Sequence, residues 1–196
     1  NAPGRLTPLV APVMQAERYG DKPLYFSDVV VRADSPLTGW NDLAQTVFCY
    51  NDKGSHSGYN VVRHQLLGQK PGFFSRVVQS GSHVRSLQWI LEGKADCAAI
   101  DSTVLEQALR SQPDWATQLR VITSLGPFPM PPLVASRRLG EGRHRVIQQA
   151  LLQPDSALQH ALAQAGMRRF APVDLALYRP VLQLHTAALA ANRKFV

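Results

Sequence analysis

Short apolar runs alternate with amphipathic segments along this chain, and this alternation restricts its fold more than any other feature. Five runs, each bounded by polar residues or glycine, have the length of strands that are buried on both faces. They are Leu24–Arg32, Thr46–Tyr50, Arg76–Gln79, Asp96–Ile100 and Leu119–Thr123. The segments between them place apolar residues at helical spacing. The pattern predicts an α/β fold with a mostly parallel sheet.

Helix boundaries can be predicted from capping residues. Gly93 follows a helical apolar pattern at the position of a C-cap glycine, and Thr103 with Glu106 has the spacing of a capping box. The segment Pro127–Pro132 is expected to interrupt regular structure. Beyond it we expect a short strand at 133–135 and helices at about 141–153, 154–165 and 174–191, the last kinked or broken at Pro180.

Composition excludes several classes of protein. A chain of 196 residues with 45% hydrophobic and 18% charged residues can bury the core of one large domain or two small lobes, and it does not resemble a disordered tail. It contains no apolar run long enough to span a membrane. The net charge of +7 fits either a solvated basic surface or attraction of an anionic ligand. Because no nucleic-acid-binding motif accompanies this charge, we expect no nucleic-acid partner.

We expect no catalytic residues, no metal and no cofactor. Cys49 and Cys97 lack metal-ligand or redox spacing and read as small core residues. The segment Gly54–Gly58 resembles a nucleophile elbow superficially, but His56 stands where the central serine is required. No set of nucleophile, base and acid is evident, so a hydrolase is the less favoured alternative.

Polar loops follow three of the predicted strands where helices are expected to begin. In open α/β sheets, ligands bind beyond the carboxyl ends of parallel strands, and helix N-termini supply unpaired N–H groups for an anion. If the three loops converge, they form an anion site without lysine or arginine. The alternative is that their serine, threonine and aspartate residues are only N-caps. The loops are 51–60, 80–83 and 101–103.

At these loops the chain resembles the phosphate, phosphite and phosphonate substrate-binding proteins of ABC transporters. The likeness is clearest from about 24 to 135, where six segments occur in the family's order. The matching segments are Tyr25–Arg32 with Asp34–Pro36, Asp42–Ala44, Ser55–Asn60, Ser80–His83, Gly93–Ser102 and Pro129–Pro132.

The resemblance implies a type II periplasmic-binding-protein fold, in which two Rossmann-like lobes are joined by a hinge. One lobe would comprise 1–32 and 123–196, and the inserted lobe would comprise 41–120. The family normally begins with a further β-α-β-α unit, so the first lobe is expected to be incomplete. A lobe without those strands would expose apolar surface and open edges, which predicts a tendency to form a homodimer.

The resemblance also assigns ligand-binding residues. The anion would be held by hydroxyl and backbone groups at the helix start and by the Gly-Ser-His loop, with a tyrosine of the hinge strand lining the cleft. Further contacts would come from a strand end that faces the ligand. Carried over to this chain, the residues are Tyr25, Ser55, His56, Ser57, Gly58, Tyr59, Ser82, His83, Asp101 and Ser102.

Two departures from the pattern predict the kind of ligand. Relatives that bind aminophosphonates place acidic residues where this chain has Thr103 and Pro131. An ammonium group without a partner in a closed site would be costly. We therefore expect a ligand without an amine: a small phosphorus oxyanion such as phosphate, phosphite or a simple alkylphosphonate, or another small oxyanion.

The resemblance finally implies a partner and a location. The solute-binding component would favour a closed form when ligand binds, and a membrane permease would recognise that form. Its place would be the periplasm or another extracytoplasmic space, although the first residues do not read as a signal peptide. The alternative is an extracellular sensing domain of a signalling system, which would be expected to precede a transmembrane helix.

Overall fold

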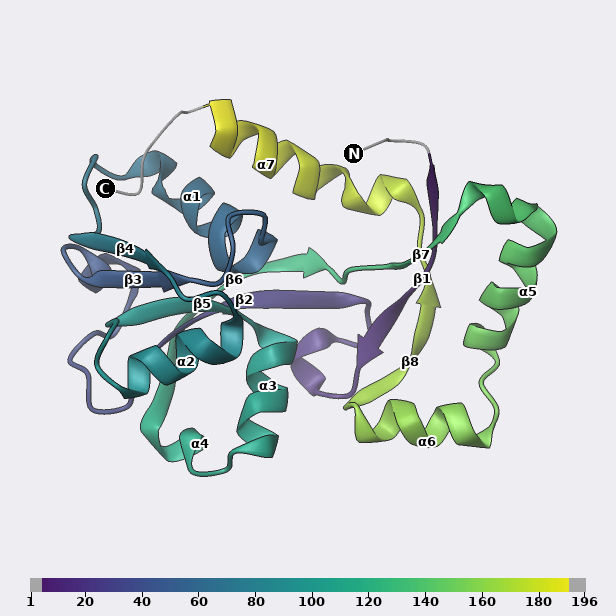
Figure 1. Cartoon of the computed structure of the whole chain (residues 1–196), viewed down its shortest axis with the longest axis horizontal. Coiled ribbons are helices and arrows are strands. Elements are labelled where there is room, and N and C mark those ends of the chain that lie inside the picture. The colour runs from purple at the N-terminus through teal and green to yellow at the C-terminus, as the bar shows by residue number, and fades with distance from the viewer. Residues whose placement is uncertain (1–4, 191–196) are drawn as a thin grey trace. The chain divides into compact units, whose positions relative to one another are not determined.

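The computed structural model describes residues 5–190, which fall into two compact units (Figure 1). Unit 1 comprises residues 5–25 and Phe128–Pro180, and unit 2 comprises Phe26–Pro127 and residues 181–190. The chain passes from one unit to the other within β2 (Leu24–Arg32), β6 (Leu119–Pro129) and α7 (Arg179–Ala190). The two lobes expected from the sequence stay a prediction. The compact units differ from them in grouping residues 181–190 with the inserted segment.

Unit 2 is built on a five-stranded sheet with the order β4-β3-β5-β2-β6. Strands β3 (Val47–Tyr50), β4 (Arg76–Gln79) and β5 (Cys97–Asp101) are mutually parallel, whereas β2 pairs antiparallel with β5. The expected parallel arrangement therefore holds for three strands, and the complete sheet is mixed. Because β2 runs against β5, Ser27 near its beginning lies opposite Asp101 at the end of β5.

Alternation along the central strands divides the core of unit 2 between the two faces of the sheet. Val29, Val31 and Phe48 belong to one cluster of buried residues, and Val30 and Cys49 belong to the other. Helix α1 (Val61–Gln65) packs on the first face through Val62, and α2 (His83–Leu91) and α3 (Ser102–Ser111) cover the second (Figure 1). The unit therefore has three layers, with the sheet in the middle.

The helices of unit 2 begin at side-chain caps. Ser55 precedes a π-helical turn, η3 (His56–Asn60), which continues through α1 into a 3₁₀ turn, η4 (Leu66–Gly68). Ser82 caps α2, and Gly93 ends it with a φ of 69°, as the sequence predicted. The capping-box prediction was wrong: α3 starts at Ser102, and its cap is Asp101 in place of Thr103. The remaining helical elements are η2 (Trp40–Leu43) and α4 (Trp115–Gln118).

Cys49 and Cys97 are free, buried thiols, in agreement with the prediction that they are small core residues. They lie on adjacent strands, but Cys97 is opposite Phe48 and Cys49 is opposite Ala98. Because neighbouring residues of a strand point to opposite faces, the two thiols belong to different core clusters. Burial raises the pKa of Cys49 to about 12 and raises the pKa of Cys97 further still.

Unit 1 contains an antiparallel sheet with the order β7-β1-β8. Its strands are β1 (Leu6–Met14), β7 (Leu133–Ser136) and β8 (Met167–Pro172). Helix α5 (Gly140–Leu152) is attached to the sheet by hydrogen bonds from the side chains of His144 and Gln148, and α6 (Ser156–Gln164) buries Leu162. The 3₁₀ turns are η1 (Glu17–Tyr19), η5 (Arg137–Leu139) and η6 (Leu175–Tyr178).

The two expectations about proline hold, each at a slightly shifted position. Strand β6 continues to Pro129, because it lies at the edge of its sheet and an edge strand tolerates the missing N–H. The helical segment expected at 174–191 is broken just before Pro180: a 3₁₀ turn covers Leu175–Tyr178, and α7 begins at Arg179 with the proline in its first turn. Among residues 5–190 no helix is both long and apolar enough to cross a bilayer.

We predict that Phe74→Ala destabilises the protein strongly. Phe74 is 1% exposed and stacks on Phe48 with 4.8 Å between ring centroids, so truncation leaves a cavity. The expected loss of unfolding free energy is about 3–5 kcal/mol, measured by urea denaturation. Val146→Ala, at a residue that is 68% exposed, is the control and should cost less than about 0.5 kcal/mol. Equal losses in the two variants would contradict this account of the core.

Candidate functional site

The candidate site lies where three parallel strands of unit 2 end. Asn51 follows β3, the loop from Ser80 to Ser82 follows β4, and Asp101 ends β5. The loops are joined by backbone hydrogen bonds: Ser80 N–H donates to Tyr50 O at 2.8 Å, and Gly81 N–H donates to Asn51 O at 3.1 Å. Two of the three polar loops that the sequence placed at the same edge of the sheet are thus neighbours.

His83 connects these loops through its side chain. Its Nε2 lies 3.3 Å from Ser57 Oγ and 3.3 Å from Asn51 Nδ2, so the first residue of α2 contacts both the π-helical turn and the end of β3. Asp101 is near enough for its charge to act on the imidazole, raising its pKa, but burial has the larger effect and lowers the pKa of His83 below its ordinary value. His83 is therefore neutral near pH 7.

Hydrogen bonds within the π-helical turn fix its conformation. Ser55 Oγ accepts from Gly58 N–H at 3.0 Å, and Ser55 O accepts from both the backbone and the side-chain amide of Asn60, at 3.0 and 2.9 Å. Ser27 Oγ donates to Ser57 O at 2.8 Å, which ties the turn to β2. The backbone at the helix start is fixed before any ligand arrives.

Gly58 is required by a close approach. A Cβ at this position would lie 2.0 Å from Asn51 Oδ1 and 3.0 Å from His83 Cε1. No other residue type could bring the turn so near both side chains without displacing them. The glycine therefore determines how closely Ser57 can approach His83.

Several predicted site residues also have structural roles as caps or internal acceptors. Ser82 Oγ accepts from Arg85 N–H, and Ser102 Oγ accepts from Phe26 N–H at 3.0 Å. Asp101 Oδ1 accepts from the backbone N–H and the hydroxyl of Thr103, at 2.9 and 2.7 Å. The alternative that these loops are N-caps thus accounts for part of the pattern, and Ser57 with His83 is the pair that capping does not explain.

The other predicted residues are placed as follows. His56 follows the cap, and its pKa falls to about 4 because the ring is buried and His185 lies near it. Tyr59 is half-buried against Tyr50, with 4.8 Å between ring centroids. Tyr25 is buried in unit 1, with 6.1 Å between its ring centroid and that of Phe128.

Asn51 is the residue that the sequence prediction missed. It lies in the predicted polar loop 51–60, its side chain contacts His83, and its amide oxygen faces Gly58. Its position in the sequence could have indicated this role, because Asn51 is the first residue after the buried strand β3.

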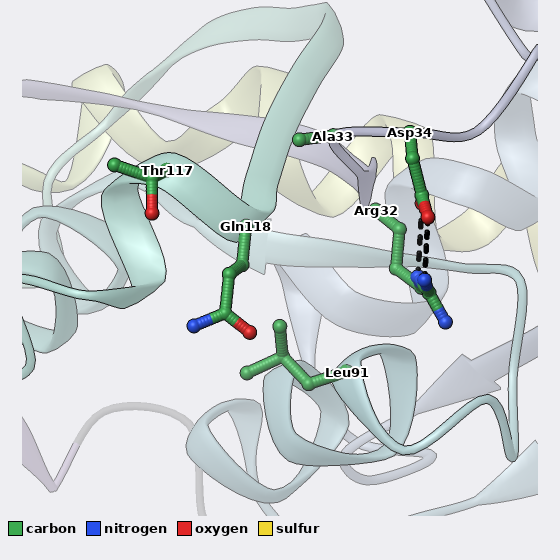
Figure 2. A pocket seen from close by; sticks show the side chains of 6 residues that line it. All are labelled: Arg32, Ala33, Asp34, Leu91, Thr117 and Gln118. Carbon is green, nitrogen blue, oxygen red and sulfur yellow. Dashed lines mark hydrogen bonds and ion pairs between the residues drawn. The ribbon is translucent and has the colours of Figure 1, made fainter.

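A pocket of about 240 Å³ lies at the opposite end of β2 (Figure 2). It is lined by Arg32, Asp34, Leu91 and Gln118, among others. The Arg32 guanidinium donates to Asp34 at 3.0 and 2.5 Å, so its charge is already matched by a carboxylate. The pocket does not offer an unpaired cation to an anion, and the strand ends are the better candidate.

The arrangement around His83 is not that of a hydrolase. In a serine hydrolase, a carboxylate accepts from the histidine nitrogen that faces away from the serine. Here His83 Nδ1 has no hydrogen-bond partner among residues 5–190, and Asp101 Oδ1 accepts from Thr103. No group of three or more metal-binding side chains occurs in that part of the chain either.

Comparison with solved structures defines the class of fold. A binding protein component of an ABC phosphonate transporter from Pseudomonas aeruginosa superposes with a TM-score of 0.81 at 20% identity, over 96% of this chain and 64% of that one. PhnD1 from Prochlorococcus marinus, in complex with methylphosphonate, gives 0.72 at 18% identity, over 92% and 72%. A Xanthomonas citri protein bound to ATP gives 0.72 at 17% identity, over 96% and 72%. The fold is therefore the mixed α/β fold of periplasmic binding proteins, as predicted.

The family follows from the sequence profile. Residues 5–178 match the family described as the phosphonate periplasmic substrate-binding protein of ABC transporters. The chain belongs to this family, which confirms the resemblance inferred from its motifs. It is a family of binding proteins, in agreement with the expectation that the chain is not an enzyme. The chain spans 64% of the length of the Pseudomonas aeruginosa protein, and no curated protein matches it.

We predict that Gly58→Ala distorts the site. The added methyl group would lie 2.0 Å from Asn51 Oδ1, so the Asn51 side chain must rotate and lose its contact with His83. Thermal denaturation should show a loss of about 1–3 kcal/mol, typical of overpacking. Gly39→Ala is the matched control, because a Cβ there meets nothing within 4 Å. A Gly58→Ala variant as stable as Gly39→Ala would contradict the close approach.

Proposed function

We propose that the protein is the substrate-binding component of an ABC transporter and captures a small phosphorus oxyanion without an amine. The observation that carries this proposal is the meeting of His83 and Ser57 at the ends of the parallel strands of unit 2. Both side chains can donate hydrogen bonds, and the adjacent helix start supplies N–H groups and a partial positive charge. Charge-assisted bonds from such groups are the means by which proteins hold oxyanions without a cation.

Membership of the phosphonate-binding family supports the chemical class of the ligand. The Prochlorococcus marinus relative is in complex with methylphosphonate, an oxyanion of the proposed kind. The Xanthomonas citri relative is bound to ATP, so the fold also accommodates a phosphate group on a larger ligand. A binding experiment must therefore test whether the protein prefers a small oxyanion or a nucleotide.

The absence of an amine is supported by the surroundings of Asp101. The residue two positions later is Thr103, whose hydroxyl donates to Asp101 Oδ1 and adds no second negative charge. A ligand ammonium group would lose its hydration and gain only a carboxylate that is already hydrogen-bonded. The partner would be a membrane permease, and the location would be the periplasm named in the family description.

We expect methylphosphonate, phosphite or phosphate to raise the melting temperature in a thermal-shift assay, whereas 2-aminoethylphosphonate should not. Calorimetric titration would then give the affinity. Ser57→Ala and His83→Ala should each weaken binding about tenfold, the loss of one charge-assisted hydrogen bond. Arg32→Ala, in the pocket of Figure 2, is the control and should bind normally. Tight binding of 2-aminoethylphosphonate or of ATP alone would refute the proposed ligand, and unchanged affinity in both site variants would refute the site.

We also propose that the protein forms a homodimer through unit 1. Exposed large apolar residues gather there: Leu6, Leu133 and Val134 are 52%, 44% and 48% exposed. Strand β7, which carries two of them, is a free edge of its sheet, whereas the other edge, β8, carries Arg168 and Arg169. An apolar edge strand is a surface on which a second copy can pair, and charge on an edge prevents this.

Light scattering coupled to size-exclusion chromatography should show a dimer fraction that grows with concentration. Val134→Lys should abolish it, because the charge would lie on the pairing edge. Val121→Lys is the matched control: Val121 is also an exposed valine of an edge strand, 41% exposed, but it belongs to unit 2. A monomer at every concentration would refute the dimer, and dissociation by Val121→Lys alone would refute the assigned edge.

A further inference from the structure

The two ring nitrogens of His83 have different surroundings. Nε2 lies 3.3 Å from both Asn51 Nδ2 and Ser57 Oγ, whereas Nδ1 is buried without a hydrogen-bond partner among residues 5–190. Because burial keeps the imidazole neutral, one nitrogen carries a proton and the other carries a lone pair. Which nitrogen carries the proton determines whether His83 can donate from Nδ1.

The orientation of the Asn51 amide follows from its contact with Gly58. A Cβ added to residue 58 would lie 2.0 Å from Asn51 Oδ1. This oxygen therefore faces the Cα–H of Gly58. Asn51 Oδ1 is buried without a conventional hydrogen-bond partner among residues 5–190, and the Cα–H of Gly58 supplies a weak one, whereas an NH₂ group there would press its own hydrogen against the Cα–H. The amide nitrogen must therefore face His83.

The backbone holds the Asn51 side chain in this position. Asn51 O accepts from Gly81 N–H at 3.1 Å and from the Gln79 side chain at 3.4 Å, so the residue is fixed to the same loop that carries His83. An amide nitrogen can only donate, so the His83 nitrogen that faces it must accept. Ser57 Oγ lies at the same distance from Nε2 and can donate to it in the unliganded protein, and its hydroxyl rotates to donate to an anion when one binds.

We propose that Asn51 is a positioning residue that fixes His83 in the tautomer protonated on Nδ1, so that Nδ1–H is the imidazole's donor to the bound oxyanion. This inference rests on the proposed function, because it takes His83 to be a ligand-binding residue. Nδ1 is buried without a hydrogen-bond partner among residues 5–190. In this proposal the bound anion accepts the hydrogen bond that Nδ1–H otherwise lacks. The opposite tautomer would direct a lone pair at the anion and repel it.

The tautomer can be observed directly. In protein labelled with ¹⁵N-histidine at pH 8, where His83 is neutral, two-bond proton–nitrogen spectra distinguish the protonated nitrogen from the unprotonated one. We expect Nδ1 to be protonated in the unliganded protein and after addition of methylphosphonate, with the His83 signals assigned by their loss in His83→Gln. A proton on Nε2 in both states would overturn the inference.

Asn51→Asp tests the cause. A carboxylate can only accept, so Nε2 should become the protonated nitrogen, and methylphosphonate affinity should fall at least about tenfold. Gln88→Glu is the charge-matched control, because it adds the same charge to α2, the helix that carries His83, at an exposed position. Its affinity should stay within about twofold of the original. If Asn51→Asp leaves the tautomer unchanged, Asn51 does not set it.

Replacing the histidine separates this inference from the proposed function. The amide nitrogen of Asn can occupy the position of Nδ1, and that of Gln reaches the position of Nε2. His83→Asn should therefore retain more affinity for methylphosphonate than His83→Gln. Equal, strong losses in both would leave the ligand site intact but contradict the role of Nδ1. Normal binding by both variants would show that His83 is not a ligand residue, which is a failure of the proposed function itself.

Discussion

The contact between Gly58 and the Asn51 side chain holds the candidate site together. It brings the π-helical turn against the end of β3, and the same amide reaches His83 at the start of α2. The end of β3, the π-helical turn and the start of α2 thus meet at one side chain. The contact depends on the lack of a Cβ at position 58, since even a methyl group would overlap the amide oxygen.

Buried serine hydroxyls near the candidate site form hydrogen bonds that keep the loop before His83 ordered. Ser80 and Ser86 are buried and bonded to each other at 2.6 Å, and Ser80 also donates to the backbone of Tyr50. A buried hydroxyl that makes its hydrogen bonds costs little, whereas an unpaired one costs about 1–3 kcal/mol. The network therefore fixes the loop that carries His83, so that binding an anion would not require that loop to become ordered.

Much of unit 2 could be predicted from the sequence because its strands are short, apolar and bounded by polar loops. Unit 1 could not be predicted as well, because its central strand contains Pro8 and Pro12, and proline argues against a strand in the middle of a sheet. The structure accommodates Pro8 beside a register shift in the pairing with β7. Strand β8 was missed because Arg168 and Arg169 interrupt its apolar pattern, as suits an edge strand.

Some residues of the candidate site could likewise be predicted from the sequence, and others could not. Ser57 and His83 were predicted to share a site, and their side chains are 3.3 Å apart. The prediction did not single out Asn51, because the pattern of a single loop does not reveal which of its side chains will meet another loop. Nor could the sequence show that Ser55, Ser82 and Asp101 accept hydrogen bonds inside their own loops, since a cap and a ligand donor use the same residue types.

The two cysteines could serve as separate reporters of the two core layers of unit 2, one on each face of its sheet. Cys97 lies in the layer that contains Phe48, and Cys49 lies in the layer beneath α2 and α3. A thiol that is sealed in a core reacts only when its surroundings open, and different parts of a fold open with different free energies. The rate at which each thiol is modified would therefore measure how often its own side of the sheet separates from the helices that cover it.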